Sequence, residues 1–196
     1  QNKHNRLHGT SEPLDDKMVE EIEDGKMGPT DDVKIRAKKL VEEYGWEKED
    51  TQKLWCFGPE NVGPNVVVDV TKGTQFMNEI KESVCSSFQH TTKQAVLTEE
   101  QMRGGRYNIT DCELHTDAIH RGGGQIMPTT RRLVYALELL SKPTLLEPIF
   151  SCEITAPMDA MGGVYQTLNQ NRGEVVEEVQ IAGTPLNLVL FSIILG

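Results

Sequence analysis

Residues 106–140 read RYNITDCELHTDAIHRGGGQIMPTTRRLVYALELL and contain the pattern that decides the fold class. Residues 106–114 have the alternation of a half-buried strand, with Tyr107 and Ile109 on one face. Residues 128–140 carry apolar side chains at helical spacing, which predicts an amphipathic helix. A strand followed by a helix across a glycine-rich connection is typical of an α+β domain, in which helices pack against a sheet.

The same reasoning extends toward the N-terminus. Apolar spacing and capping residues predict helices at residues 14–25, 31–44 and 75–94, and β-branched runs predict strands at residues 53–57 and 66–68. Residues 1–13 are polar and turn-rich, with Gly9 and Pro13, so we expect no regular element there. Together with residues 106–140, these elements form one α+β unit.

A second unit is expected after Lys142-Pro143, so we divide the chain into residues 1–143 and 144–196. In the second part, patterns predict a strand, a helix and two strands, at residues 149–154, 163–169, 174–180 and 185–195. This order is the beginning of a ferredoxin-like βαββαβ unit. Without the second helix and fourth strand, such a unit has an open sheet edge and an uncovered apolar face.

Charge limits how this chain can meet nucleic acid. The formal net charge is −10, whereas a surface that coats RNA should be basic. Any RNA contact must therefore be local, through a small basic tip on an acidic body that repels phosphate from its other faces. A second reading, in which the charge only keeps the protein in solution, stays open.

Nothing in the sequence predicts a membrane, metal or disulfide site. No stretch reaches the ~20 apolar residues that a membrane span needs. The chain begins without a methionine or a secretory leader, so we expect a fragment of a cytoplasmic protein with no membrane partner. The four cysteines, Cys56, Cys85, Cys112 and Cys152, form no CxxC pair, which favours free thiols.

The glycine-rich connection is the strongest candidate site. Three successive glycines at residues 122–124 tolerate conformations and close approaches that other residues do not. Because they lie between a strand and a helix, we expect His120 and Arg121 on an exposed turn, where Arg121 could pair with phosphate or stack on a base. An ordinary strand-to-helix loop, in which the glycines relieve backbone strain, remains the alternative.

Several chemistries are disfavoured at this connection. A P-loop is excluded because Gln125 follows the glycines where Lys should stand, and consecutive glycines do not match the dinucleotide fingerprint. His115 and His120 lack the further ligands of a zinc site. A histidine enzyme with His120 as general base and Asp117 as its partner has no supporting nucleophile or cofactor motif.

The nine residues 117–125, DAIHRGGGQ, resemble the diphthamide loop of the eukaryotic elongation factor 2 family. Other segments agree in order: residues 2–6 (NKHNR), 54–59 (LWCFGP), 69–73 (DVTKG), 102–104 (MRG), 173–175 (GEV) and 182–185 (AGTP). The resemblance covers nearly the whole chain. It implies the family's fourth domain without its opening strand at residues 1–143, and the first part of the fifth domain at residues 144–196.

The resemblance also implies a fold and a site. The fold would be a ribosomal protein S5 domain 2-like α/β sandwich, with helices on one side of its sheet, followed by a truncated ferredoxin-like βαββ unit. His120 would be converted to diphthamide. The remaining ribosome-binding residues would be Asn2, Lys3, His4, Asn5, Arg6, Asp117, Ala118, Ile119, Arg121, Gly122, Gly123, Gly124 and Gln125. Of these, Lys3, Arg6 and Arg121 would contact phosphates, while the glycines let the backbone approach closely.

The implied parent is a translational GTPase that moves tRNA and mRNA through the ribosome. Its partners would be the decoding centre of the small ribosomal subunit, the tRNA–mRNA duplex, the diphthamide-synthesis enzymes and ADP-ribosylating toxins of the diphtheria type. GTP and Mg would bind in a separate GTPase module. We therefore expect this chain to bind no cofactor and to have no enzymatic activity, and we expect its one special group to be the diphthamide on His120. A ribosome- or RNA-binding relative that does not translocate is the alternative.

Two segments depart from the family pattern. Residues 8–11 read HGTS where a strand-like apolar segment is usual, and residues 186–196 are atypical for the start of the fifth domain. These departures leave the tip loops unaffected.

Overall fold

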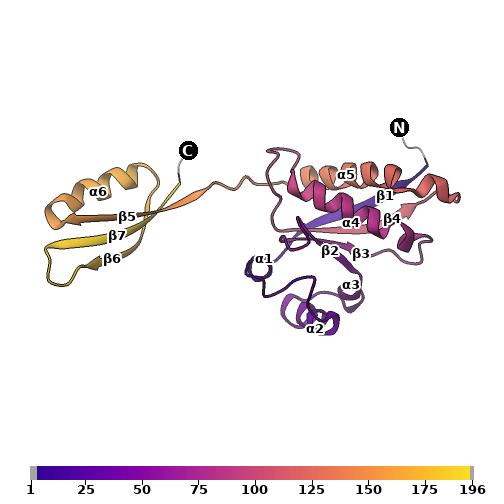
Figure 1. Ribbon diagram of the computed structural model, residues 1–196, viewed down its shortest axis with the longest axis horizontal. Coiled ribbons are helices and arrows are strands. Elements are labelled where there is room, and N and C mark those ends of the chain that lie inside the picture. Colours follow the sequence, from indigo (N-terminus) through magenta and orange to yellow (C-terminus); the bar gives the residue numbers. More distant parts are fainter. Residues whose placement is uncertain (1–3, 195–196) are drawn as a thin grey trace. The chain divides into compact units, whose positions relative to one another are not determined.

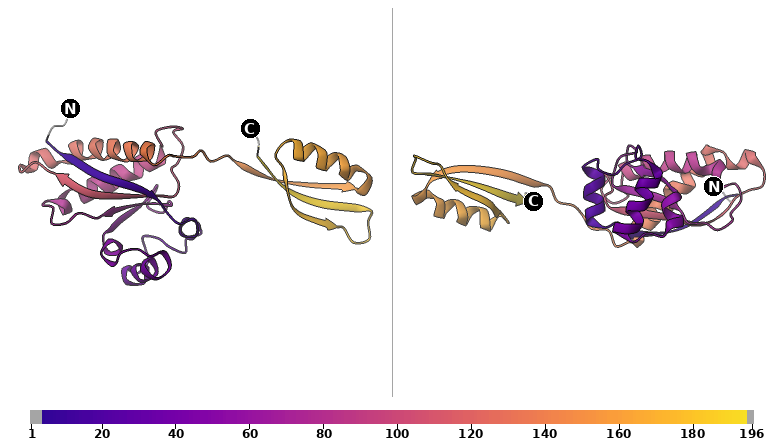
Figure 2. Two further views of the ribbon diagram at one scale, coloured as in Figure 1. Left: turned by 180° about the vertical axis from the view of Figure 1, so that it is seen from behind. Right: turned by 90° about the horizontal axis from the view of Figure 1, so that it is seen from below.

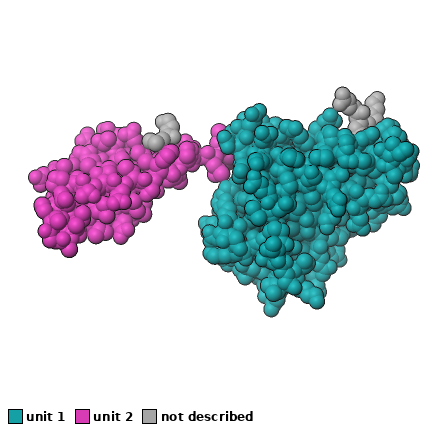
Figure 3. Space-filling view, viewed as in Figure 1, with its two compact units in different colours: residues 1–143 teal, residues 144–196 magenta. Residues whose placement is uncertain are grey.

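The computed structural model of the protein describes residues 4–194. The chain forms two compact units, Gln1–Pro143 and Thr144–Gly196 (Figure 3). Asn2 and Lys3, two of the predicted site residues, lie outside the described residues.

Unit 1 is built around a four-stranded sheet (Figure 1). Its strands are β1 (Arg6–Pro13), β2 (Leu54–Gly58), β3 (Asn65–Asp69) and β4 (Gly105–Glu113), in the spatial order β1-β4-β3-β2. The pairs β1/β4 and β2/β3 are antiparallel, whereas β3 and β4 are parallel. The parallel pair requires a crossover, which the long helix α4 (Met77–Lys93) supplies.

Helices cover both faces of this sheet. α4 and α5 (Gly123–Leu140) lie on one side, and α1 (Asp16–Glu23), α2 (Val33–Tyr44) and α3 (Lys48–Gln52) lie on the other (Figure 2). Strand β3 shows why: Val67 packs into the cluster with α4 and α5, while Val66 and Val68 pack into the cluster with α1 and α2. The α+β prediction is confirmed. The expectation of helices on one side only is wrong, because both faces of β3 are apolar and must be buried.

Strand β1 corrects the expectation of no regular element at residues 1–13. Of its inward positions, Leu7 packs against the core, but the next two, Gly9 and Ser11, carry small residues and break the apolar pattern. A Cβ at Gly9 would lie 2.6 Å from the Asn108 carbonyl oxygen and 3.2 Å from the Leu137 side chain. Ser11 donates a hydrogen bond to the Leu137 carbonyl at 3.0 Å. Residues 6–13 therefore form a strand that packs closely between β4 and α5, and apolar periodicity does not reveal it.

Helix α5 begins five residues earlier than predicted, at Gly123 instead of Pro128. A proline often marks the first turn of a helix, which is why the pattern suggested a later start. Gly122 caps α5, Gly123 and Gly124 lie in its first turn, and a short 3-10 helix, η1 (Ala118–Arg121), precedes it. The connection between β4 and α5 is accordingly shorter and more ordered than a glycine loop.

Unit 2 is a three-stranded antiparallel sheet with one helix. β5 (Ile149–Pro157), α6 (Met158–Gln170), β6 (Glu174–Gln180) and β7 (Leu186–Ile194) follow one another, and the sheet order is β5-β7-β6. Val189 and Phe191 of β7 pack with Met161 and Leu168 of α6. The predicted βαββ order is confirmed, and β5 and β6 form the two edges of the sheet.

Candidate functional site

The two predicted site loops meet at one end of unit 1. Strands β1 and β4 are antiparallel, and Arg6 at the start of β1 pairs with Glu113 at the end of β4. This register brings the residues before β1 beside the connection between β4 and α5. We call residues 4–6 together with residues 115–125 the tip.

Asn5 joins the two halves of the tip. Its side chain is almost fully buried, with 3% of its surface exposed. The amide Nδ2 donates to the His120 carbonyl at 2.6 Å, and Oδ1 accepts from the His115 backbone N–H at 3.1 Å. Few side chains offer a donor and an acceptor in this fork, so asparagine specifies the position of the loop.

Three imidazole rings pack against one another at the tip. His120 stacks on His4 with ring centroids 4.5 Å apart, and His115 meets His120 edge-on at the same distance. His120 is consequently half-buried rather than fully exposed as expected, and its Nδ1 has no hydrogen-bond partner among residues 4–194. Ile119 beside it is 79% exposed.

The turn that carries His120 is held by Asp117. The Asp117 carboxylate accepts from the Ile119 backbone N–H at 3.2 Å, and its carbonyl accepts from the His120 N–H at 3.1 Å. The Asp117 N–H donates to His115 Nδ1 at 3.0 Å, which leaves the proton of a neutral His115 on Nε2. Asp117 therefore caps η1 and orients the His115 ring.

Arg121 is buried, so its expected place on an exposed turn is wrong. Its guanidinium pairs with Glu79 of α4 at 2.6 Å and donates to the carbonyls of His115 and Thr116 at 2.8 and 2.7 Å. The same group lies 3.9 Å above the ring of Phe76. With its donors used inside the protein, Arg121 anchors the tip to α4 and is not presented to a phosphate.

Among the other tip residues, the cation of Arg6 is exposed. Its contact with Glu113, at 3.3 Å, is a surface pair with more than half of each side chain accessible. Ala118, Gly122 and Gly124 are exposed as well, while Gln125 is half-buried. The structure thus brings the described predicted residues together at one end of unit 1, with Asn5 and Arg121 buried.

The three glycines are not required by the backbone. None of Gly122, Gly123 and Gly124 has a positive φ, and a Cβ would meet open space at Gly124 and at Gly122 nothing nearer than 3.9 Å. At Gly123 a Cβ would lie 3.4 Å from Ser83 Oγ, an ordinary contact. Relief of backbone strain, the alternative explanation for these glycines, is therefore wrong.

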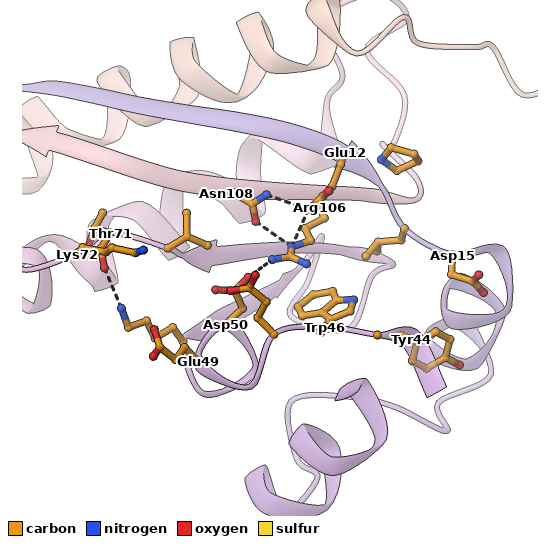
Figure 4. A pocket seen from close by; sticks show the side chains of 16 residues that line it. Glu12, Asp15, Tyr44, Trp46, Glu49, Asp50, Thr71, Lys72, Arg106 and Asn108 are labelled. Carbon is orange, nitrogen blue, oxygen red and sulfur yellow. Dashed lines mark hydrogen bonds and ion pairs between the residues drawn. The ribbon is translucent and has the colours of Figure 1, made fainter. Parts of the chain in front are cut away.

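Unit 1 also contains a hollow of about 760 Å³ between α2, α3 and the ends of β1, β3 and β4 (Figure 4). At its floor, Arg106 pairs with Asp50 at 2.6 Å and lies 3.9 Å over the Trp46 ring. The carboxylates that line it are those of Glu12, Asp15, Glu47, Glu49 and Asp50. Lys53, Lys72 and Arg106 also line the hollow, but the carboxylates outnumber these cations, and the excess negative charge disfavours phosphate there.

Other classes of site find no support in the described part of the chain. Within residues 4–194, no group of three or more His, Cys, Asp or Glu side chains is arranged to hold a metal ion. None of the described helices is both long and apolar enough to cross a membrane.

Comparison with protein families places these features in context. Residues 27–142 match the model of elongation factor G, domain IV, which is more than half of the chain. The chain belongs to the elongation factor G family. Residues 144–193 match the elongation factor G C-terminus, so both units are accounted for within this family, and the α+β fold prediction is confirmed. The β4–α5 connection lies inside the matched range, whereas residues 4–6 precede it.

A solved structure shows the same fold. A crystal structure of a protein from Thermus thermophilus is similar, with a TM-score of 0.54 and 19% sequence identity over 66% of this chain. The chain spans 19% of that protein's length. At this identity the similarity supports the fold alone and does not extend to individual residues.

Proposed function

We propose that this chain is part of a eukaryotic elongation factor 2, a translational GTPase. In this proposal the tip enters the decoding centre of the small ribosomal subunit while tRNA and mRNA move by one codon. Membership in the elongation factor G family supports the ribosome as the partner. The motif at residues 117–125 and its place at a strand-to-helix junction support the narrower assignment.

The bare backbone of the tip is the observation that carries the proposal. Gly122 and Gly124 are exposed, unstrained and free of neighbours that would exclude a side chain. Gly124 lies in the first turn of α5, where glycine costs stability relative to alanine, by up to about 1 kcal/mol, whereas Gly122 is the N-cap, a position that glycine favours. An outside surface that must come close explains the glycine at position 124. The tRNA–mRNA duplex is such a surface, because proteins read paired RNA mainly by shape and backbone contacts.

His120 is the proposed site of diphthamide. Its ring is packed between His4 and His115, and its backbone is held by Asn5, so an extension on this ring would start from a fixed point. Diphthamide would add a cationic, hydrogen-bonding group. Arg121 cannot supply this charge to the surface, because Glu79 already neutralises it. The modification would therefore complement Arg6 as a source of positive charge at the tip.

The remaining partners follow from the same assignment. The diphthamide-synthesis enzymes and ADP-ribosylating toxins of the diphtheria type would act at His120, in the cytoplasm. GTP and Mg would bind in another module of the parent protein. This chain would contribute the surface that contacts RNA.

The test is the mass of the tryptic peptide of residues 107–121 from protein isolated from its native cells. We expect an added mass that fragmentation localises to His120. The peptide of residues 82–93, which contains His90, is the matched control and should have its unmodified mass. An unmodified His120 in native protein would refute the assignment to elongation factor 2, while membership in the wider family would stand.

A further inference from the structure

Two of the four cysteines pack in the main core of unit 1, Cys56 on strand β2 and Cys85 on helix α4. In β2, Cys56 and Gly58 point to the same side of the sheet, because strand residues alternate. That side is covered by α4: a Cβ at Gly58 would lie within 3 Å of the Phe88 and Thr92 side chains. Cys56 accordingly belongs to the core cluster that contains Phe88.

The position of Cys85 follows from the directions of the two elements. The distance along the strand from Gly58 back to Cys56 is about 6.6 Å. At about 1.5 Å per residue, this equals about four residues of helix, from the Phe88–Thr92 turn back to Cys85. Cys85 lies three residues before Phe88 on the same side of α4, and it packs against the core cluster that contains Cys56.

The two thiols have different environments. Cys56 is buried, whereas Cys85 is half-buried. The interaction with Cys56 lowers the pKa of Cys85, outweighing its partial burial, and the charge of Lys81 one turn earlier acts in the same direction. The interaction with Cys85, together with burial, raises the pKa of Cys56. Cys85 is thus the thiol that more readily becomes a nucleophilic thiolate.

We propose that Cys56 and Cys85 form a redox modification site whose substrate is a hydroperoxide. The Cys85 thiolate attacks one oxygen of the hydroperoxide and the O–O bond breaks, which forms a sulfenic acid. The departing hydroxide or alkoxide takes up the proton that the Cys85 thiol lost and leaves as water or an alcohol. The Cys56 sulfur then attacks the Cys85 sulfur, the S–O bond breaks, and the Cys56 proton leaves with the displaced hydroxyl as water. Two thiols are oxidised to one disulfide while one hydroperoxide is reduced.

The other two cysteines lack these features. Cys112 is buried beside Met77, 2.9 Å between the sulfur atoms, and burial raises the pKa of Cys112 to about 11. Cys152 lies in unit 2, with no second cysteine in that unit. Selectivity for the Cys56–Cys85 pair is therefore expected.

The disulfide would join the helix that anchors the tip to the central sheet. The first turn of α4 carries Glu79, which holds Arg121. A covalent link from Cys85 to β2 would keep α4 in register with the sheet when other contacts are weakened. This site depends only on unit 1 and is independent of the assignment to elongation factor 2.

The test treats the reduced full chain with hydrogen peroxide and follows it by mass spectrometry. We expect the intact mass to fall by two hydrogen atoms, and a tryptic digest to contain residues 54–72 linked to residues 82–93, both reversed by dithiothreitol. Cys152→Ser is the matched control and should react as the parent does. Cys85→Ser should form no disulfide, and Cys56→Ser should stop at a Cys85 sulfenic acid that dimedone captures.

Three results would overturn the proposal. The first is Cys85 that proceeds to sulfinic acid while Cys56 stays reduced. The second is a disulfide that involves Cys112 or Cys152 instead. The third is a parent chain in which Cys85 reacts no faster than Cys152. Since Cys85 is half-buried, Cys85→Ser should fold, and its circular-dichroism melting curve verifies this before the oxidation is interpreted.

Discussion

Replacing Arg121 with methionine removes the guanidinium but keeps a long side chain over Phe76. The carbonyls of His115 and Thr116 each lose a charged donor, at about 1.5 kcal/mol each. The pair with Glu79 adds only about 0.5 kcal/mol, because half of the Glu79 side chain is exposed and solvent screens it. Thr116 is exposed, so water can replace part of its lost bond. We therefore expect unit 1 to lose about 3 kcal/mol at most.

Urea unfolding followed by tryptophan fluorescence measures this loss in the right unit. Trp46 and Trp55 are the only tryptophans of the chain, and both lie in unit 1. With a urea dependence of about 2 kcal/mol per molar, the midpoint should fall by about 1 to 1.5 M. Arg6→Met is the matched control. Its surface pair with Glu113 predicts a change below about 0.5 kcal/mol.

Equal midpoints for the two variants would refute this reasoning. Arg121 would then contribute no more than a surface cation does, and its guanidinium would be free to bind phosphate as the sequence suggested. A midpoint that falls only for Arg121→Met would assign the residue to the support of the tip.

Four further changes test other contacts. Asn5→Ala removes both hydrogen bonds that join the tip and should lower the free energy of unfolding by about 1 to 3 kcal/mol in the same urea assay. Gly9→Ala places a Cβ against the Asn108 carbonyl and should cost about 1 to 3 kcal/mol, seen as a lower Tm. Gly124→Ala should instead preserve or raise Tm, since space is open and φ is negative, while it weakens ribosome binding of the full-length factor in a pelleting assay. Burial raises the pKa of Glu138, so the folded state binds its proton more tightly and stability falls as pH rises past the unfolded pKa. Glu138→Gln should therefore unfold at higher urea than the parent at pH 7 and at equal urea below about pH 4; no difference at pH 7 would contradict the raised pKa.

The regular elements with strong apolar periodicity could be read from the sequence. α2 and α4 were predicted within about two residues, because a helix that buries one face must repeat its apolar residues. β1 could not be read in this way. Two of its inward residues, Gly9 and Ser11, are small because β4 and α5 approach closely there, and that distance is a property of the assembled sheet.

The motif brought the predicted site residues to one end of unit 1, but it gave no indication of their electrostatics. Nothing in the order of residues indicates that Glu79, more than forty positions away from Arg121 in the chain, would neutralise it. The exposure of Arg121 was inferred from neighbouring glycines, which are indeed at the surface. The arginine next to them is buried, because its guanidinium is held by Glu79 and by the carbonyls of His115 and Thr116.

The two edges of the unit 2 sheet differ in how they would meet another strand. β6 is an edge with Glu174, Glu177 and Glu178, charges that discourage pairing with a further strand. β5 has a single carboxylate, Glu153, and begins with the exposed residues Ile149 and Phe150. A sheet with one guarded and one unguarded edge cannot grow from both sides. If two such chains paired through β5, each β5 edge would be hydrogen-bonded to the other and only the charged β6 edges would remain. Self-association through this sheet would therefore stop at a dimer and would not extend into a fibre.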